Sequence, residues 1–275
     1  MIVFGHRLTG PALFGFTVIA LYLVCIAFAP WLARHGEAAL VGDSWMPPSA
    51  AAWLGTDSIG RDLWSRLLYG GRTTVGLALI ATTIAFVVGI VLGFGVAIAP
   101  RWIDMILSRF VDTLMAIPQL IMALVVLSVL GTSIPALIGT IALLDATRVF
   151  RLSRAVAMEI VVLEYVEVSK LRGEGLWWII RREILPNAVP PLVVEFGYRF
   201  CYAFLFIASL SFLGLGIQPP HADWGSMVRE NATAINLGSM APLIPAATIA
   251  LLTISVNLVV DWFLSIQGES HGESA

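Results

Sequence analysis

Charge is scarce in this chain of 275 residues: only 12% of them are Asp, Glu, Lys or Arg, whereas soluble proteins average about 25%. The hydrophobic set makes up 59% of the sequence, and the mean hydropathy is +0.90. Such a chain has too few polar side chains to cover a soluble globule, so it is predicted to be an integral membrane protein. The formal net charge of −2, with no solvated basic stripe, gives no indication of nucleic-acid binding.

Cysteine is also rare, and the common catalytic patterns are missing. Cys25 and Cys201 both lie in apolar runs without a CxxC pattern, so neither a disulfide nor a metal site is predicted. The sequence has no phosphate loop of the GxxxxGK type and neither of the hydrolase patterns HExxH and GxSxG. The chain is therefore predicted to bind no cofactor and not to be an enzyme by itself. An intramembrane hydrolase with a serine or an aspartate pair remains an alternative.

Long apolar runs dominate what is present. A helix that crosses the bilayer needs about 20 mainly apolar residues. The sequence lacks the strand alternation of a membrane barrel, so the fold class is predicted to be all-α, a polytopic bundle of about six transmembrane helices. The first run is longer than the roughly 7 to 15 residues of a signal-peptide core, so we interpret it as a retained span. The six runs are approximately 10–32, 75–99, 113–130, 134–150, 193–216 and 241–264.

The distribution of Lys and Arg predicts an orientation. With a cytoplasmic N-terminus, ten of these residues fall in cytoplasmic segments and five in outer segments, which favours cytoplasmic N- and C-termini. The chain is accordingly divided into four parts: 1–52, with the first span and the start of an outer loop; an outer amphipathic segment, 53–72; a core, 73–266; and a short polar tail, 267–275.

The stretch GTDSIGRDLWSRLLYGGR, residues 55–72, begins with helix-capping residues and continues with an apolar stripe. Asp62 and Arg66 lie four residues apart, the spacing of a helical ion pair. We interpret this stretch as a short helix on the outer membrane surface, with the loop 217–240 joining the last two spans on the same side.

A few polar residues and glycines lie inside the apolar runs. Glu195 and Arg199, four residues apart, are predicted to form an ion pair. Charges at this depth either neutralise each other or line a wet path through the bundle, and both interpretations remain open. Asp145 is expected near a cytoplasmic helix end, where exposure would remove most of the cost of its charge. Gly89 and Gly93 predict the close approach of another helix.

The longest polar stretch lies between the fourth and fifth runs, at about 151–191. Residues 152–171 are typical of a helix, and Gly173 and Gly175 permit the positive backbone angles of a sharp reversal. The following residues alternate apolar and basic faces before Leu185–Pro186 ends a second helix. We therefore predict two helices parallel to the membrane, joined by a glycine turn. Such a hairpin would either rest among lipid headgroups or dock into a groove on a soluble partner.

This stretch also contains an acidic residue, a glycine and a Leu-Pro pair at a familiar spacing: Glu167, Gly173, Leu185 and Pro186. It resembles the cytoplasmic loop of bacterial ABC-importer permeases, which follows the pattern E-A-A-x3-G-x9-I-x-L-P. The chain departs from that pattern at three positions, where Val168 and Ser169 replace the alanines and Glu183 replaces the isoleucine.

Three further stretches strengthen the resemblance: WLGTDSIGRDLWSRLLYGGR, REILPNAVPPLVVE and SLSFLGLGIQPPHADWG. They are similar to segments of the dipeptide, oligopeptide and nickel permease family, of the second-subunit type with an extra N-terminal span. The resemblance extends from about residue 53 to residue 261. It implies a type I permease bundle in the bacterial inner membrane, with 151–191 as its coupling loop.

The resemblance also implies partners and roles. The partners would be a second homologous permease subunit, two ABC ATPase subunits that bind ATP and Mg²⁺, an extracytoplasmic substrate-binding protein and membrane lipid. Glu167 would contact the ATPase, and Gly173 would form the turn. The cargo would be di- or oligopeptides, with nickel or another metal chelate as the alternative. An ATP-independent secondary transporter or channel is the alternative from a different class, although it leaves the loop unexplained.

Three groups of site residues follow from these interpretations. The coupling group comprises Glu167, Val168, Ser169, Gly173, Leu185 and Pro186. The candidate translocation path contains Glu195 and Arg199. The expected outer docking surface comprises Asp57, Arg61, Asp62 and Trp224.

Overall fold

The computed structural model describes residues 2–3 and 6–272, and these residues are mainly helical, which confirms the predicted all-α class. The one strand pairing in the described part is a short antiparallel pair, β1 (Ile2–Val3) and β2 (His6–Arg7). The helices are α1 (Gly10–Ala27), α2 (Ala29–Leu32), α3 (Leu63–Ile98), α4 (Arg101–Ala116), α5 (Gln119–Leu130), α6 (Ile134–Val161), α7 (Glu164–Leu171), α8 (Leu176–Ile179), the π-helix η1 (Ile180–Ile184), α9 (Leu185–Phe212), α10 (Trp224–Glu230), the 3₁₀-helix η2 (Ala232–Leu237) and α11 (Leu243–Gly272).

Within the described residues, four helical segments are long and apolar enough to cross a membrane. They are Gly10–Ala27, Leu63–Ile98, Leu176–Phe212 and Leu243–Ile266, and α4 with α5 would make a fifth if this bent pair forms one span. By length and composition, the described residues thus contain four or five spans, where the sequence predicted about six. The fourth predicted span, 134–150, is the first part of α6, which continues through charged residues to Val161.

The third predicted span, 113–130, is wrong as a single helix. The chain turns by 90° between α4 and α5, and Ile117 between them has an extended backbone, with ψ at 129°. The physical reason is Pro118, because a proline disfavours the helical conformation of the residue before it and lacks the N–H that a continuous helix would need.

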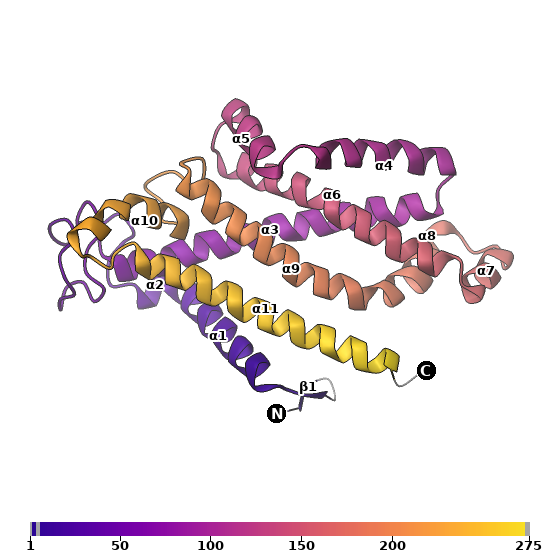
Figure 1. Cartoon of the computed structure of the whole chain (residues 1–275), viewed down its shortest axis with the longest axis horizontal. Helices are drawn as coiled ribbons and strands as arrows, with labels where there is room; N and C mark the ends of the chain where they lie inside the picture. The colour runs from indigo at the N-terminus through magenta and orange to yellow at the C-terminus, as the bar shows by residue number, and fades with distance from the viewer. Residues whose placement is uncertain (1, 4–5, 273–275) are drawn as a thin grey trace. The chain divides into compact units, whose positions relative to one another are not determined.

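The chain divides into two compact units. Unit 1 comprises Met1–Leu79, Gly131–Leu137 and Phe200–Ala275, and unit 2 comprises Ile80–Leu130 and Ile138–Arg199. In unit 1, α1 packs along α11 (Figure 1). A Cβ atom at Gly15 would lie 2.6 Å from the Ser255 carbonyl oxygen, so glycine allows these helices to approach closely. The Tyr22 hydroxyl donates to the Thr248 carbonyl oxygen at 3.1 Å and fixes the pairing.

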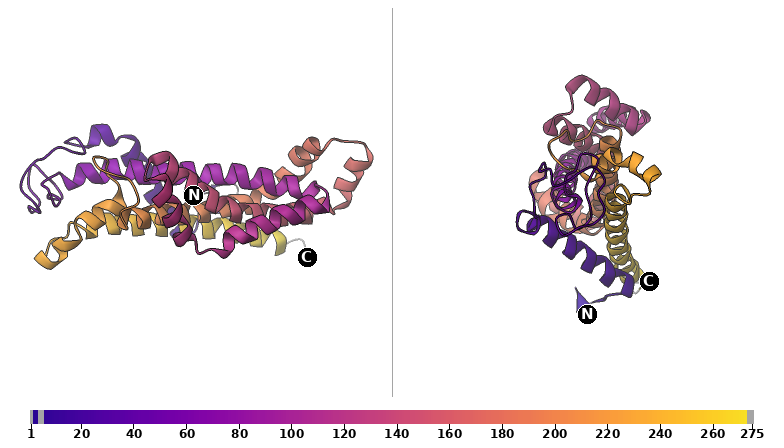
Figure 2. Two further views of the ribbon diagram at one scale, coloured as in Figure 1. Left: turned by 90° about the horizontal axis from the view of Figure 1, so that it is seen from above. Right: turned by 90° about the vertical axis from the view of Figure 1, so that its left-hand side faces the viewer.

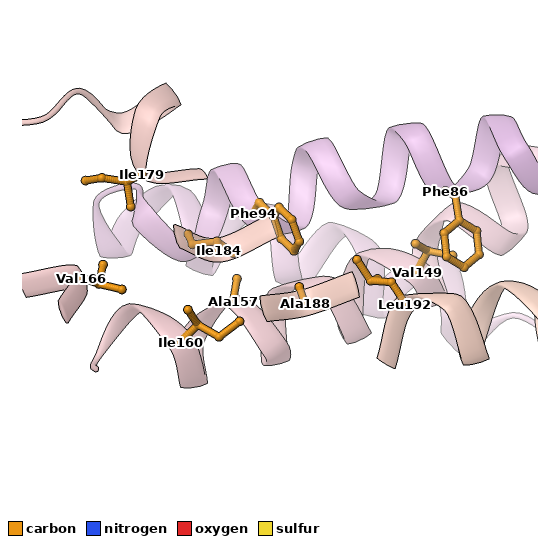
Figure 3. Packing of buried hydrophobic residues seen from close by; sticks show 10 residues of the cluster. All are labelled: Phe86, Phe94, Val149, Ala157, Ile160, Val166, Ile179, Ile184, Ala188 and Leu192. Carbon is orange, nitrogen blue, oxygen red and sulfur yellow. The ribbon is translucent and has the colours of Figure 1, made fainter. Parts of the chain in front are cut away.

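Unit 2 is organised around an apolar cluster contributed by α3, α6, α7, α8, η1 and α9 (Figure 3). A Cβ atom at Gly89 would lie 2.6 Å from the Val149 Cβ atom, and one at Gly93 would lie 2.8 Å from the Ser153 Cβ atom. The predicted close helix approach is therefore confirmed, and its partner is α6. The cluster comprises Phe86, Phe94, Val149, Ala157, Ile160, Val166, Ile179, Ile184, Ala188 and Leu192.

The predicted surface helix over 55–72 is wrong. Residues 55–62 are irregular, with isolated bridges that pair Leu40 with Arg61 and Thr56 with Asp62, and α3 begins only at Leu63. Gly60 has a φ of +88°, which a helix cannot accommodate. The apolar stripe after it belongs to the first turns of a long helix.

Candidate functional site

The polar stretch forms a helical hairpin, which consists of α7, a turn and α8 with η1; we call residues 162–184 the α7–η1 hairpin. It lies at the C-terminal end of α6 in Figure 1 and in the left view of Figure 2. The predicted continuous helix over 152–171 is interrupted, because α6 ends at Val161 and Leu163 has an extended backbone before α7. The hairpin is shorter than the predicted loop 151–191, because residues 151–161 belong to α6 and residues 185–191 belong to α9.

The turn depends on one glycine. Gly173 has a φ of +78°, a conformation that L side chains rarely adopt, which confirms its predicted place in the turn. Gly175 has a φ of −71° and caps α8, so the predicted positive angle there is wrong. Leu185–Pro186 does not end the second helix but begins α9. The π-helical turn immediately before Pro186 shifts the hydrogen-bond register, and this allows the helix to continue through a residue without an N–H.

The outer face of the hairpin combines charge with apolar side chains. Glu167 and Lys170 on α7 and Arg172, Arg181 and Arg182 after it are exposed. Large apolar side chains are exposed beside them, and such a surface is typical of contact with a partner or with lipid headgroups. The most exposed are Val162, Val168, Leu171, Leu176 and Trp177, at 77%, 45%, 82%, 59% and 71%.

The inner face of the hairpin is closed by apolar and polar contacts. Val166, Ile179 and Ile184 are buried in the unit 2 cluster. Ser169, also buried, lies 3.0 Å from Glu183 through its hydroxyl and the Oε1 atom. The Asn187 amide donates to the Tyr165 hydroxyl at 3.1 Å and to the Glu183 carbonyl at 2.7 Å. The bonds from Ser169 to Glu183 and from Asn187 to Tyr165 join opposite sides of the turn, and no spacing rule in the sequence predicts them.

Two acidic side chains and one arginine are partly or fully buried farther along unit 2. Glu195 and Arg199 form the predicted ion pair on α9, with Oε1 and Nε 2.6 Å apart. Asp145 is fully buried in the middle of α6, so its expected position at an exposed helix end is wrong. The reason is that α6 extends a further sixteen residues beyond Asp145, from 146 to 161, so position 145 is not a helix end.

The four residues expected to form an outer docking surface are buried in unit 1. Asp57, Arg61, Asp62 and Trp224 are 0%, 6%, 1% and 2% exposed, so the expectation that these side chains themselves form a surface is wrong. They hold the irregular segment and α10 in place instead. The Trp224 indole donates to the Leu67 carbonyl at 2.8 Å. Other side chains between residues 40 and 59 are exposed instead, including Leu40, Trp53 and Ile59.

A buried network of charges joins the 53–72 segment to α10. The Asp57 carboxylate pairs with Arg61 and Arg66, and Glu230 pairs with the same two guanidinium groups, 2.6 Å from Arg61 Nη2 and 2.8 Å from Arg66 Nη1. The predicted Asp62–Arg66 pair does not form, because Asp62 accepts hydrogen bonds from Ser65 instead. Two cations thus face two anions in a space largely closed to water.

Burial and the surrounding hydrogen-bond donors act on the pKa of Asp57 in opposite directions. Burial alone would raise it, but hydrogen bonds from the backbone of Arg61 and Ile59, with the nearby charges of Arg66 and Arg61, outweigh burial. The pKa of Asp57 is therefore held below its ordinary value of 3.8. The carboxylate stays ionised at neutral pH, as the network requires.

Comparisons with known proteins agree on one family. Residues 86–269 match the model of the "binding-protein-dependent transport system inner membrane component" family. A probable D,D-dipeptide transport system permease protein of Escherichia coli is 34% identical over 89% of this chain and 82% of its own. A di/tripeptide transport system permease protein of Pseudomonas aeruginosa is 33% identical over 91% and 85%.

A glutathione transport system permease protein of Pectobacterium atrosepticum is 33% identical over 78% of this chain and 71% of its own. Among solved structures, an amino acid ABC transporter with histidines covers 72% of this chain and 92% of its own, with a TM-score of 0.55 and 19% identity. At that identity the likeness concerns the fold alone.

Proposed function

Because the chain belongs to the family of binding-protein-dependent transport system inner membrane components, we propose that it is the permease subunit of an ATP-driven importer of di- or oligopeptides. The observation that carries the proposal is the α7–η1 hairpin, which exposes Glu167 and apolar side chains between two long helices. A docking element of this kind explains why a hydrophobic chain keeps a charged stretch in its middle. Relatives named for dipeptide, di/tripeptide and glutathione transport support a peptide cargo.

In this proposal the chain performs no ATP chemistry itself. Two partner ATPase subunits bind ATP and Mg²⁺, and their closure displaces the α7–η1 hairpin. The displacement reaches α6 and α9 directly, because the hairpin is continuous with both helices. Rigid-body rocking of these helices against a second, homologous permease would open the path alternately to each side of the membrane.

The orientation and the outer partner belong to the same proposal. The hairpin lies in the cytoplasm, as do both chain ends, in agreement with the excess of Lys and Arg. In the same orientation, the segment around residues 40–62 and α10 belong to the outer segments, and Leu40, Trp53 and Ile59 are exposed there. We propose that these side chains meet the substrate-binding protein, and that the buried ion network keeps them in place. Glu195 and Arg199 remain the proposed polar lining of the path.

The test is reconstitution of the complete complex in proteoliposomes. ATP hydrolysis and uptake are measured with the binding protein and a panel of alanine di-, tri- and tetrapeptides. We expect at least one of these peptides to stimulate both. If no ATPase subunit copurifies with the chain, the proposal is wrong.

A charge reversal in the hairpin makes the test specific. E167K is expected to lower uptake about a hundredfold, because reversal of an interfacial charge costs several kcal/mol, while membrane insertion stays normal. E159K is the matched control, since Glu159 is exposed near the end of α6 but lies outside the hairpin. Normal uptake by E167K would contradict the docking role.

A further inference from the structure

Ser169 and Glu183 connect the two arms of the α7–η1 hairpin. Ser169 is 4% exposed, although serine is a polar residue that is mostly exposed in proteins. Its hydroxyl lies 3.0 Å from Oε1 of Glu183, fourteen residues later in the chain. Glu183 itself lies within the π-helical turn, and π-helical turns occur often at functional sites.

The Ser169 hydroxyl has two acceptors but only one proton. It lies 3.1 Å from the Tyr165 carbonyl oxygen of its own helix as well as 3.0 Å from Glu183. A serine hydroxyl donates one hydrogen bond at a time, so these two bonds exclude each other. If Glu183 moves away, the hydroxyl turns to Tyr165 and no buried donor is left without a partner. The bond across the hairpin can therefore open without the usual cost of an unsatisfied group.

The position of this bond gives it a mechanical consequence. Besides the turn at Gly173, α7 is held to the second arm by the apolar cluster that contains Val166, Ile179 and Ile184, whose contacts are non-directional, and just beyond η1 by the exposed 3.1 Å bond from the Asn187 amide to the Tyr165 hydroxyl. The Ser169–Glu183 bond is the buried polar link between α7 and η1 itself. A hydrogen bond to a carboxylate is directional and stronger than one between neutral groups. The bond between Ser169 and Glu183 therefore fixes how α7 is rotated against η1. The η1 segment continues without a break into α9.

We propose that Ser169 and Glu183 form a releasable latch, as positioning residues that set the angle of α7 against η1 and pass its displacement to α9. The inference rests on the proposed function, since it assumes that a partner displaces α7. Substitution of Ser169 or Glu183 should then change the amount of peptide transported per ATP hydrolysed, while docking of the ATPase and ATP hydrolysis continue.

The first experiment measures peptide uptake per ATP hydrolysed in the reconstituted complex. S169A removes the donor and E183L removes the acceptor, and each is expected to lower the ratio about tenfold, the effect of one lost charge-assisted hydrogen bond. The double variant S169A/E183L should lose no more than either single variant, because all three lack the same bond. S169T retains the hydroxyl and E183Q retains an acceptor oxygen, so both should restore most of the ratio.

The control is S255A, which removes a buried hydroxyl that donates to the Leu251 carbonyl within its own helix. A ratio for S169A equal to that of S255A would overturn the latch. So would a loss in E183Q as large as that in E183L, because the charge and not the bond would then be required.

The second experiment needs neither peptide nor ATP. Spin labels at 170 and 182, both exposed positions, report the distance between α7 and η1 in the C25A/C201A chain in nanodiscs. The distance distribution should be narrow in this background and in its S255A variant, and broad with S169A. An unchanged distribution with S169A overturns the latch. If no ATPase subunit copurifies, the proposed function and the coupling role both fail, whereas these distances still decide whether the bond orders the hairpin.

Discussion

The buried charge network of unit 1 makes a strong prediction for D57N. Asp57 is 0% exposed, and its Oδ1 atom accepts from the backbone N–H groups of Ile59 at 3.0 Å and Arg61 at 2.9 Å. Its Oδ2 atom accepts from Arg61 Nε at 2.6 Å and from Arg66 Nη1. Asparagine can keep the Oδ1 bonds, but its NH₂ group takes the place of Oδ2. The N–H groups of this amide would then face the N–H groups of Arg61 and Arg66, and no hydrogen bond can form between two donors.

The magnitude follows from the charge balance. The wild-type network has two guanidinium groups and two carboxylates, and D57N leaves Glu230 alone between Arg61 and Arg66. Removal of one partner from a buried ionic network costs about 3–5 kcal/mol, because a charge stays buried without compensation. In a chain of this size the unfolding temperature should fall by roughly 10 °C.

The assay is thermal unfolding of the purified chain in detergent, with D43N as the control. Asp43 lies in the same irregular part of the chain and is exposed, so the same substitution should change stability by less than about 0.5 kcal/mol. The double variant D57N/R66M restores one cation to one anion and should be more stable than D57N. A loss in D57N no larger than that in D43N would refute the reasoning.

The effect of pH gives an independent check. Because the pKa of Asp57 is lower in the folded state than its ordinary 3.8, its ionised form stabilises the fold fully above that pH. The stabilisation is lost as the pH falls through the folded-state value. The stability difference between wild type and D57N should thus be constant from pH 7 to about 5 and shrink below pH 3.8. A difference that vanished already near pH 6 would contradict this assignment.

Two further predictions concern packing. G89A should destabilise the chain by about 1–3 kcal/mol, because the new methyl group meets the Phe150 backbone N at 2.9 Å. In G95A the new methyl group meets no atom within 4 Å, so this substitution should stabilise α3 by roughly 0.5–1 kcal/mol. Thermal unfolding of both variants checks the contrast, and equal effects would contradict it. W224F should cost at least about 1 kcal/mol in the same assay, because it removes the 2.8 Å bond to the Leu67 carbonyl and part of the packing of a buried ring, and no measurable loss would contradict this.

The sequence predicted local features where one residue dictates the conformation. Gly173 was recognisable as a turn because few other residues adopt its positive φ, and the Glu195–Arg199 pair because a helix brings residues four apart together. The paired glycines Gly89 and Gly93 likewise predicted close helix packing, although not its partner. These successes depend on short-range geometry.

The errors arose where distant segments compete with local preference. The spacing of Asp62 and Arg66 favoured a helical pair, but Asp57 and Glu230 offer Arg66 two carboxylates in a buried site. Leu185–Pro186 looked like a helix end, whereas a π-helical turn carries the helix through it. Neither partner choice nor hydrogen-bond register can be derived from residue types within one stretch.

By itself, the sequence determined that this is a helical membrane protein, because apolar runs without charge can satisfy their backbone only as helices in lipid. Its motifs also determined the family, which residues 86–269 confirm. Only the tertiary structure decided which charges are exposed: it buried Asp57, Arg61 and Asp62 and left Glu167 outside. The physical reason is that burial depends on what packs against a side chain, and those neighbours come from remote parts of the chain.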